Sequence, residues 1–563
     1  MARPGRVAEG DGFALAFFSI TSAPVHKGDS VSGSQRQTPR LGKKKGGAAP
    51  LPASRRRSGL AFRTADLVKR TAGPAPIRRD RGRREAAATP REGREVGMSS
   101  ATIRYYSTNR ELDGVPGITP FRGQVAFREA LLMGQAPDEG LFMPAAIPTL
   151  ALADILALKG RPYPEAAFLV AEAFLKDEIG RDDLKRLVED AYSFGVPLER
   201  VTGRKYLLRL DQGPTASFKD FAARLMARLM GHFREAGSRL NVLVATSGDT
   251  GSAVGEAFKG VPGIDVTILY PRAEVSGRQK RQLDTIGANV QALSIDGKFD
   301  DCQTLVKQAF ADPDLAAFHL TSANSINFGR ILPQIVYYIW SYAQLAEDGE
   351  AIVVSVPSGN FGDALGCEYA RRIGLPVATL VMPTNENDEF PNFLATGVYE
   401  KVQPSRACLS NAMNVGHPSN LARFFDLYGG TVDRNGRVHR PPDVAEMRRR
   451  IFSVSVSDDE TRRTIRRVYD RYGILLEPHG AVGWRGLERF VEQRGEGGDP
   501  LCLVLETAHP AKFPEEIRAL LGIDPVPPAG MRDLDQRTGE ALPLPADYRI
   551  FRQYLLDRLK REA

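Results

Sequence analysis

The sequence predicts an α/β protein with two parallel-sheet domains, preceded by a mainly helical N-terminal domain. From Lys205 onward, short apolar runs alternate with amphipathic stretches at the spacing typical of strands followed by helices. Between residues 102 and 204, apolar residues instead recur at helical spacing. The chain has 563 residues, which is too long for one ordinary domain and favours two or three.

The first 97 residues form a basic tail without hydrophobic periodicity, and we expect it to be disordered. The tail holds 21 Lys and Arg against 8 Asp and Glu, a net charge of +13, whereas the rest of the chain carries −5. This division argues against a broad nucleic-acid surface on the body. We favour a start site assigned too early, with Met98 near the true start, and an organellar transit peptide is the runner-up. A secretory signal is disfavoured, because Glu9 and Asp11 stand where a positive flank belongs.

We expect four segments along the chain. The basic tail covers residues 1–97, and the N-terminal domain covers residues 98–204. Residues 205–525 form the α/β region, in which two subdomains are interleaved in the sequence. Residues 526–563 form a C-terminal extension.

The α/β region divides into regular elements. Apolar runs predict strands at 240–246, 265–270, 289–295, 318–322, 351–356, 377–382 and 501–505. Amphipathic stretches predict helices at 252–259, 276–286, 301–310, 328–345, 363–373, 461–472 and 514–521. Residues 386–450, rich in Asn, Pro and Arg, break the alternation. The longest apolar stretch, 331–343, is interrupted by Gln334 and Ser341, so we expect a buried helix rather than a membrane span.

Two junctions between a strand and a helix are candidates for anion binding. Residues 243–252 and 354–363 each pass from an apolar strand through a loop rich in Gly and Ser into a helix. Glycine allows close approach of the backbone, and the free amides and dipole of a helix N-terminus attract negative charge. Neither loop matches a nucleotide-binding fingerprint. Either loop alone is also compatible with an ordinary turn, but two hydroxyl-rich loops favour two anion sites.

A lysine at the start of an amphipathic helix is the third candidate. Residues 213–221 read GPTASFKDF, and the helix that follows carries an apolar stripe of core residues. Lys219 falls in the first turn, where the helix dipole disfavours a cation. A lowered amine pKa suits attack on a carbonyl group. Position alone favours a surface lysine paired with Asp220.

The segment 213–221 resembles the cofactor-lysine motif of threonine synthases, which are fold-type-II pyridoxal-phosphate enzymes with the fold of tryptophan synthase β. The resemblance continues in order through residues 246–251, 324–327, 357–363, 477–481 and 507–513. Upstream, residues 105–108 and 136–144 resemble the N-terminal domain of the longer, bacterial and fungal type. The similarity covers about residues 102–525.

The resemblance implies that pyridoxal 5'-phosphate is the cofactor. Lys219 would bond to the cofactor aldehyde and then move protons, and the hydroxyl of Thr507 would face the pyridine nitrogen. The residues that would hold the cofactor, mainly its phosphate, are Gly359, Asn360, Phe361 and Asp363. The candidates for substrate binding are Thr246, Ser247, Asp249, Thr250, Asn324, Ser325, Asn327 and Arg330. Asn324 and Asn327 are equally suited to completing a turn, whereas Arg330 opens a buried-looking helix and suits a phosphate.

The implied activity is that of a carbon–oxygen lyase acting on phosphates, which converts O-phospho-L-homoserine and water to L-threonine and phosphate. Substrate and cofactor would each bring one phosphate, in agreement with two anion loops. A related phospholyase, or a threonine or serine dehydratase that yields a 2-oxoacid, is the alternative. We expect a small-molecule substrate, no nucleic acid, no membrane partner and no metal site, in a monomer or homodimer. The expected location is the cytoplasm, or an organelle if residues 1–97 are a transit peptide.

Overall fold

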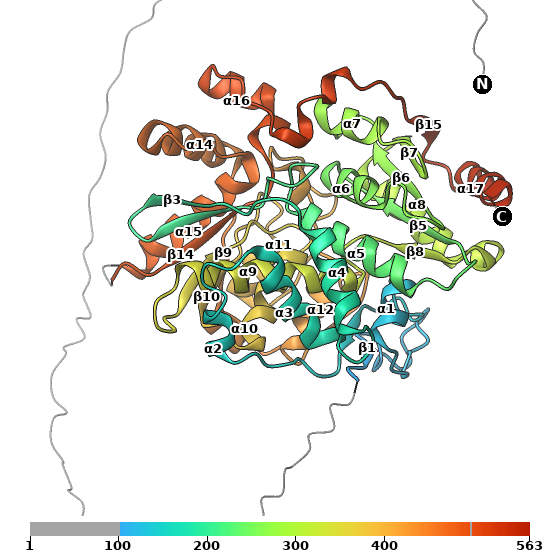
Figure 1. Ribbon diagram of the computed structural model, residues 1–563, viewed down its shortest axis with the longest axis horizontal. Helices are drawn as coiled ribbons and strands as arrows, with labels where there is room; N and C mark the ends of the chain where they lie inside the picture. The colour runs from blue at the N-terminus through green and yellow to red at the C-terminus, as the bar shows by residue number, and fades with distance from the viewer. Residues whose placement is uncertain (1–101, 496–497, 563) are drawn as a thin grey trace, which may run out of the picture. The chain divides into compact units, whose positions relative to one another are not determined.

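The computed structural model describes residues 102–495 and 498–562 (Figure 1). The basic tail predicted over residues 1–97 lies outside the described residues. Four sheets are present in the described part, and the two larger ones carry the architecture. None of the described helices combines the length and the apolar character needed to span a membrane.

The first large sheet has six strands in the order β13-β10-β9-β14-β4-β3. Its strands are β3 (Leu198–Thr202), β4 (Lys205–Arg209), β9 (Ile352–Ser355), β10 (Val377–Val381), β13 (Ile451–Phe452) and β14 (Cys502–Glu506). Neighbouring strands run parallel except for the β3–β4 hairpin, which is antiparallel. The central strands β9 and β14 are buried along their whole length, as expected for a parallel sheet covered on both faces.

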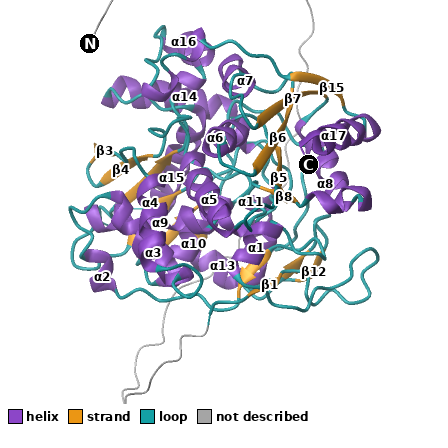
Figure 2. Cartoon of the chain, turned by 45° about the vertical axis from the view of Figure 1, so that its right-hand side comes forward, coloured by secondary structure: helices purple, strands orange, loops and turns teal. Residues whose placement is uncertain are grey.

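The second large sheet has five parallel strands in the order β15-β7-β6-β5-β8. Its strands are β5 (Leu240–Ala245), β6 (Ile264–Pro271), β7 (Val290–Asp296), β8 (Leu320–Ser322) and β15 (Leu542–Pro545). The chain enters the first sheet, builds four strands of the second, returns to the first and ends in the second. The predicted α/β fold with two interleaved parallel sheets is therefore confirmed, and Figure 2 shows the two groups of strands apart from one another.

Helices cover the faces of these sheets. They are α5 (Lys219–Phe233), α6 (Asp249–Phe258), α7 (Gly277–Asp284), α8 (Phe299–Ala311), α9 (Leu332–Leu345), α10 (Gly362–Ile373), α14 (Asp458–Tyr472), α15 (Pro478–Arg494) and α16 (Pro514–Leu521). The helix predicted at 328–345 is divided into a short 3-10 turn, Phe328–Arg330, and α9. Helix α6 begins at Asp249, earlier than predicted, because Gly248 turns the chain with φ +132°.

Helix α15 has no counterpart among the predicted elements, because its glycines hide the helical pattern. These glycines are required by close packing rather than by turns. A Cβ at Gly480 would lie 1.6 Å from Glu506 Oε2, and a Cβ at Gly486 would lie 2.6 Å from Pro383. The helix therefore approaches the first sheet more closely than a helix with larger residues could.

The N-terminal domain is mainly helical, as predicted. Its elements are β1 (Tyr105–Ser107), α1 (Phe127–Met133), β2 (Phe142–Pro144), α2 (Leu152–Leu156), α3 (Tyr163–Leu175) and α4 (Arg181–Ala191). Helix α3 packs on α9 and α4 packs on α5, and their apolar residues join one core with those helices. The rings of Tyr163 and Phe194 lie 5.3 and 5.0 Å from the ring of Phe221 in α5, both edge-on. The N-terminal domain thus fixes the first turn of α5.

The segment predicted to break the alternation, 386–450, adds no strand to either large sheet. It contains α11 (Glu389–Thr396), α12 (Leu421–Leu427), β11 (Thr431–Val432), β12 (Val438–Arg440) and α13 (Val444–Arg450). Strands β11 and β12 form a small antiparallel pair.

The C-terminal segment from residue 526 completes the second sheet. Strand β15 pairs with β7, and α17 (Tyr548–Glu562) packs against α8 (Figure 1). Phe551 and Leu555 of α17 are buried in one apolar cluster with Leu305 of α8. This segment is therefore an integral part of the second-sheet subdomain.

The packing of α17 predicts a large effect of a single truncation. We expect Phe551→Ala to lower the free energy of unfolding by about 3–5 kcal/mol, because it removes a buried ring and leaves a cavity. Ile550→Ala on the exposed side of the same helix is the control, with a change within about 0.5 kcal/mol. Urea unfolding followed by circular dichroism measures both, and equal midpoints would show that α17 does not belong to the cooperative fold.

Candidate active site

The two predicted anion loops line a single cavity, which lies at the carboxyl ends of β5 and β9. In open α/β sheets, ligands bind beyond the carboxyl ends of the strands. The cavity is also lined by Lys219 and Phe218 from the start of α5 and by Thr507 from the end of β14. Two sheets that are separate in the fold thus contribute to one site.

The loop that follows β5 is organised by Thr246. Its buried hydroxyl accepts hydrogen bonds from the amides of Gly248, at 3.0 Å, and Gly251, at 2.9 Å. These two amides belong to a loop that the sequence predicts to bind an anion, but they are already hydrogen-bonded within the loop. Ser247, Asp249 and Thr250 line the cavity beside Thr246.

The loop that follows β9 is held in a strained conformation at Phe361, whose φ is +62°. Strain of this kind persists only where the surroundings fix it, and it is common at functional sites. The ring of Phe361 is buried and packs edge-on against Phe390 at 4.9 Å. Helix α10 begins at Gly362, so its first amides lack partners within the helix. A Cβ at Gly359 would lie 2.9 Å from the Ala412 carbonyl oxygen, which excludes a larger residue there.

Asp363 lies in the first turn of α10, and its carboxyl group faces two hydroxyls. Tyr337 and Tyr338 both donate to Oδ1, the latter at 2.6 Å. Burial raises the pKa of Asp363 to about 6, although these hydrogen bonds oppose the shift. The other oxygen, Oδ2, is buried without a partner among the described residues.

Lys219 is positioned by contacts between its own loop and the end of β14. The amide of Phe218 donates to the Thr507 carbonyl at 2.9 Å, and the amide of His509 donates to the Ala216 carbonyl at 3.0 Å. Ala216 takes a left-handed conformation with φ +57°, which a non-glycine residue adopts only under constraint. The lysine loop is therefore tied directly to Thr507, the residue expected to face the ring nitrogen.

The charge on Lys219 is balanced by Asp249 rather than by Asp220. Lys219 Nζ lies 3.4 Å from Asp249 Oδ2, and its side chain is only 11% exposed. Asp220 instead accepts hydrogen bonds from the amide and hydroxyl of Thr215. The alternative of a surface lysine paired with Asp220 is thus wrong. Burial lowers the pKa of Lys219, and the neighbouring charges of Lys512 and Arg330 lower it further against the attraction of Asp249.

Asp249 forms ion pairs with two buried lysines. Its Oδ1 lies 2.8 Å from Lys512 Nζ and accepts a hydrogen bond from Gln279 at 2.9 Å. Burial alone would raise the pKa of Asp249, but Lys512 and then Lys219 lower it below its usual range. Asp249 is therefore ionised and joins α5, α6 and the segment that follows β14.

Arg330 is a buried guanidinium without an ion pair in the described part of the chain. Its Nη1 donates to the Ala323 carbonyl at 2.8 Å, and its Nε has no partner. Burial lowers the pKa of Arg330 to about 10, so it remains charged at neutral pH. A buried charge without a counter-ion is unfavourable, and Arg330 lines the cavity together with Asn324 and Ser325. An anion bound in the cavity would offset this cost.

Behind Thr507 lies a pair of buried carboxyl groups. The Thr507 hydroxyl donates to Glu477 Oε1 at 3.4 Å, and the amide of Glu477 donates to Glu506 Oε1 at 2.8 Å. Burial, and then the charge of Glu477, raise the pKa of Glu506 well above its usual range. The Thr507 hydroxyl therefore lies between the cavity and this buried pair of carboxyl groups.

His479 has both ring nitrogens engaged. Its Nε2 accepts from the Ala412 amide at 3.1 Å, and its Nδ1 lies 2.5 Å from Glu477 Oε2. The amide donor fixes the proton on Nδ1, so His479 orients Glu477 and a backbone segment.

Thirteen of the fourteen site residues predicted from the sequence line this cavity. The exception is Asn327, which is fully buried and whose amide donates to the Leu131 and Ser322 carbonyls and accepts from Gly329. Asn327 completes a turn and does not reach the cavity.

Sequence reasoning missed several buried polar residues around the site, namely Gln279, Gln334, Glu477 and Lys512. Gln334 carried a signal, since it interrupts an apolar helix, and its Oε1 is buried without a partner. Lys512 lies in a segment of the family resemblance, but only the fold shows that it reaches Asp249.

Comparison with known families agrees with this geometry. The family model described as pyridoxal-phosphate dependent enzyme matches residues 196–507. Models described as threonine synthase N terminus and threonine synthase C-terminal match residues 118–192 and 480–555. Fold and site thus define a pyridoxal-phosphate-dependent enzyme.

Individual relatives narrow the assignment. The threonine synthase of Escherichia coli K12 is 38% identical over 445 residues, which span 77% of this chain and 97% of that protein. The solved structure of threonine synthase from Escherichia coli has a TM-score of 0.71 at 36% identity and covers 81% of this chain and 100% of that one. The pyridoxal-phosphate-bound threonine synthase from Brucella melitensis has a TM-score of 0.72 at 35% identity, with coverages of 81% and 99%. The chain belongs to the threonine synthase family, so it is a lyase with pyridoxal phosphate as cofactor, and the predictions of family, fold, enzyme class and cofactor are confirmed.

The residues of the cavity fit this cofactor. A lysine amine, the N-terminus of a 12-residue helix and the Thr507 hydroxyl all line one space. Three lining side chains also present buried atoms without partners, namely Arg330 Nε, Gln334 Oε1 and Asp363 Oδ2. These atoms are the kind that a bound, highly polar group would satisfy.

The double ion pair of Asp249 predicts a large loss of stability in Asp249→Asn. The change leaves two buried ammonium groups without a counter-ion, so we expect a loss of about 3–5 kcal/mol. Because the pKa of Asp249 is lowered in the fold, the wild type has its full advantage above about pH 4, near the pKa of an unfolded Asp, and loses it progressively as the pH falls from there towards the lowered pKa of the folded state. Urea unfolding at pH 7 and pH 3 measures both effects.

The control is Glu256→Gln, since Glu256 lies on the same helix without a hydrogen bond or ion pair in the described structure. An Asp249→Asn protein as stable as the control at pH 7 would contradict the role of the ion pair.

Proposed function

We propose that the chain converts O-phospho-L-homoserine and water into L-threonine and phosphate, the last step of threonine biosynthesis. The observation that supports this most is a buried lysine amine beside a buried guanidinium that lacks an anion. A phosphorylated amino acid has carbon-bound protons that the Lys219 amine could remove, and it has a phosphate group that could pair with Arg330. A monomer or homodimer in the cytoplasm stays the prediction for assembly and location.

We assign the cofactor to the Lys219 side of the cavity. The loop 357–363 and the N-terminus of α10 would hold its phosphate, with Gly359, Asn360 and Phe361 setting the backbone. The Thr507 hydroxyl would face the ring nitrogen. When bound, pyridoxal phosphate withdraws electrons from the α-carbon of the substrate and makes its proton removable.

Lys219 is the base and acid of the proposed reaction. Among the described residues that line the cavity it is the only amine, and because its pKa is lowered it gives up its proton more readily than an ordinary lysine and can then accept one. It would take protons from the carbon chain of the substrate and return one after water has added at the β-carbon. Asp249 holds the amine in reach of the substrate.

Arg330 would bind the phosphate of the substrate, with help from Asn324 and Ser325. Its guanidinium would stabilise the charge that grows on the phosphate as it departs from the γ-carbon. Thr246, Ser247 and the first turn of α6 would contact the amino-acid part.

Replacing Lys219 tests the proposal most directly. We expect Lys219→Ala to lower kcat by at least about 10³-fold, because it removes both the covalent link and the proton carrier. Threonine formation from O-phospho-L-homoserine and borohydride trapping with peptide mapping are the measurements. Lys259→Ala, at an exposed position after α6, is the control. A label on another lysine, or 2-oxobutyrate without threonine, would overturn the assignment.

Replacing Arg330 tests the phosphate site. We expect Arg330→Met to lower kcat/KM for O-phospho-L-homoserine by about 10- to 150-fold, the equivalent of one charge-assisted hydrogen bond at 1.5–3 kcal/mol. Inhibition of the enzyme by inorganic phosphate should weaken in parallel. Unchanged inhibition would place the substrate phosphate elsewhere.

A further inference from the structure

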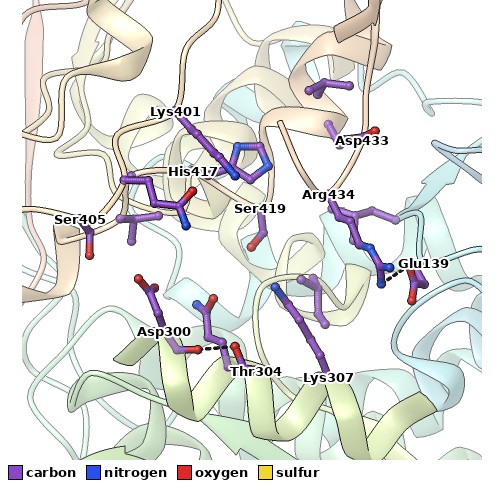
Figure 3. Close-up of a pocket in the computed structure, with 18 of the residues that line it drawn as sticks. Glu139, Asp300, Thr304, Lys307, Lys401, Ser405, His417, Ser419, Asp433 and Arg434 are labelled. Atoms are coloured by element: carbon purple, nitrogen blue, oxygen red, sulfur yellow. Dashed lines mark hydrogen bonds and ion pairs between the residues drawn. The ribbon is translucent and has the colours of Figure 1, made fainter. Parts of the chain in front are cut away.

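A second hollow lies directly outside the active-site cavity. It has a volume of about 260 Å³, which is room for a phosphate group and several waters. Figure 3 shows Lys307, Asp300 and Thr304 rising from α8 on one side, with Lys401 and His417 on the facing segment. The hollow thus lies between the second-sheet subdomain, the segment 401–434 and part of the N-terminal domain, from residue 108 to residue 141.

This outer hollow adjoins the active-site cavity. Phe299, at the start of α8, and Val415 line both spaces. Ser419 lines the outer hollow and donates through its amide to Asn360 Oδ1 at 3.3 Å, and Asn360 lines the inner cavity. The outer hollow and the active-site cavity are therefore neighbours that share lining residues.

The charges of the outer hollow leave two lysines unpaired. Among the three acidic side chains, Glu139 forms an ion pair with Arg434 (Figure 3), and Asp433 lies 2.8 Å from His439 Nε2. Lys307 and Lys401 form no hydrogen bond or ion pair with the described residues, and Asp300 is the one acidic group left to face them.

We propose that the outer hollow is an anion site that binds the phosphate group of the substrate on its way in, or inorganic phosphate on its way out, between Lys307 and Lys401. The inference rests on the proposed function, because only a phosphorylated substrate or product gives the hollow its ligand. Nothing in the proposed chemistry takes place there.

The protonation states agree with an anion site. Although the Lys307 side chain keeps much of its surface accessible, the walls of the hollow remove part of its hydration. This desolvation, and then the charges of Arg434 and Lys401, lower the pKa of Lys307, and a bound anion would relieve that repulsion. Burial, and then Lys401, lower the pKa of His417 to about 4, so His417 is neutral at pH 7. Its ring is hydrogen-bonded to the hydroxyl of Tyr399.

The physical consequence concerns rate and salt. Positive charges that have no acidic partner attract an approaching anion and raise its association rate, and added salt removes the effect. The outer hollow should thus raise kcat/KM at low salt without changing kcat.

The experiment compares four holoenzymes with O-phospho-L-homoserine at NaCl concentrations from 10 mM to 0.5 M. We expect Lys307→Gln/Lys401→Gln to lower kcat/KM about 10-fold at low salt, to leave kcat unchanged, and to approach the wild type at high salt. Lys307→Arg/Lys401→Arg should retain the wild-type values. The control is Lys159→Gln/Lys176→Gln, which removes the same charge at two exposed positions away from both spaces.

Direct binding separates the two sources of the anion and the two proposals. Inorganic phosphate titrated into the holoenzyme in a calorimeter should bind more weakly to the Gln double variant than to the control, and its product inhibition should weaken too. A loss of kcat/KM with unchanged phosphate binding would assign the hollow to entry of the substrate alone. If the Gln double variant keeps the kcat/KM, salt slope and phosphate affinity of the control, the inference is overturned. If no enzyme form makes threonine but phosphate binding still requires the two lysines, the proposed function fails and the anion site stands.

Discussion

The carboxylate of Asp249, held between the ammonium groups of Lys219 and Lys512, is the interaction on which the site depends. The three charged groups come from the start of α5, the start of α6 and the segment after β14, so one carboxylate joins both sheets at their carboxyl ends. Ion pairs at this depth are specific in geometry but carry a large desolvation cost. That cost is offset here because one carboxylate serves two cations and also accepts from Gln279.

The same site leaves other polar groups without partners. Arg330, Gln334 and Asp363 each present a buried atom that nothing in the described chain satisfies, and Phe361 and Ala216 hold strained backbones. These features reduce the stability of the fold, and they persist where surrounding packing over-determines them. The edge-on cluster of aromatic rings around Phe221 supplies such packing. The N-terminal domain therefore contributes to function by holding α5 rather than by lining the cavity.

The sequence predicts this architecture well where a single rule decides the outcome. Alternating apolar and amphipathic runs place the strands of both sheets, and ordered motifs bring nearly all of the site residues to one cavity. Prediction from the sequence fails where the deciding contact joins residues that are far apart in the sequence. Nothing local distinguishes Asn324, which lines the cavity, from Asn327, which completes a turn. Likewise, the partner of Lys219 is 30 residues away rather than adjacent, and α15 is hidden by glycines that only the packing against Glu506 and Pro383 explains.

The two proposed anion-binding regions differ in a way that follows from their surroundings. Lys307 and Lys401 are accessible to water, where a charge pair is weak and salt screens it within about 10 Å at 0.1 M. Arg330 is buried, and there the same pair is several times stronger because little water remains to compete. A phosphate that moves inward would thus pass from a weak site with rapid exchange to a strong one. A weak outer site does not hold the phosphate back at the entrance. The strongest electrostatic attraction then lies at Arg330, where the bond between the phosphate and the γ-carbon would break.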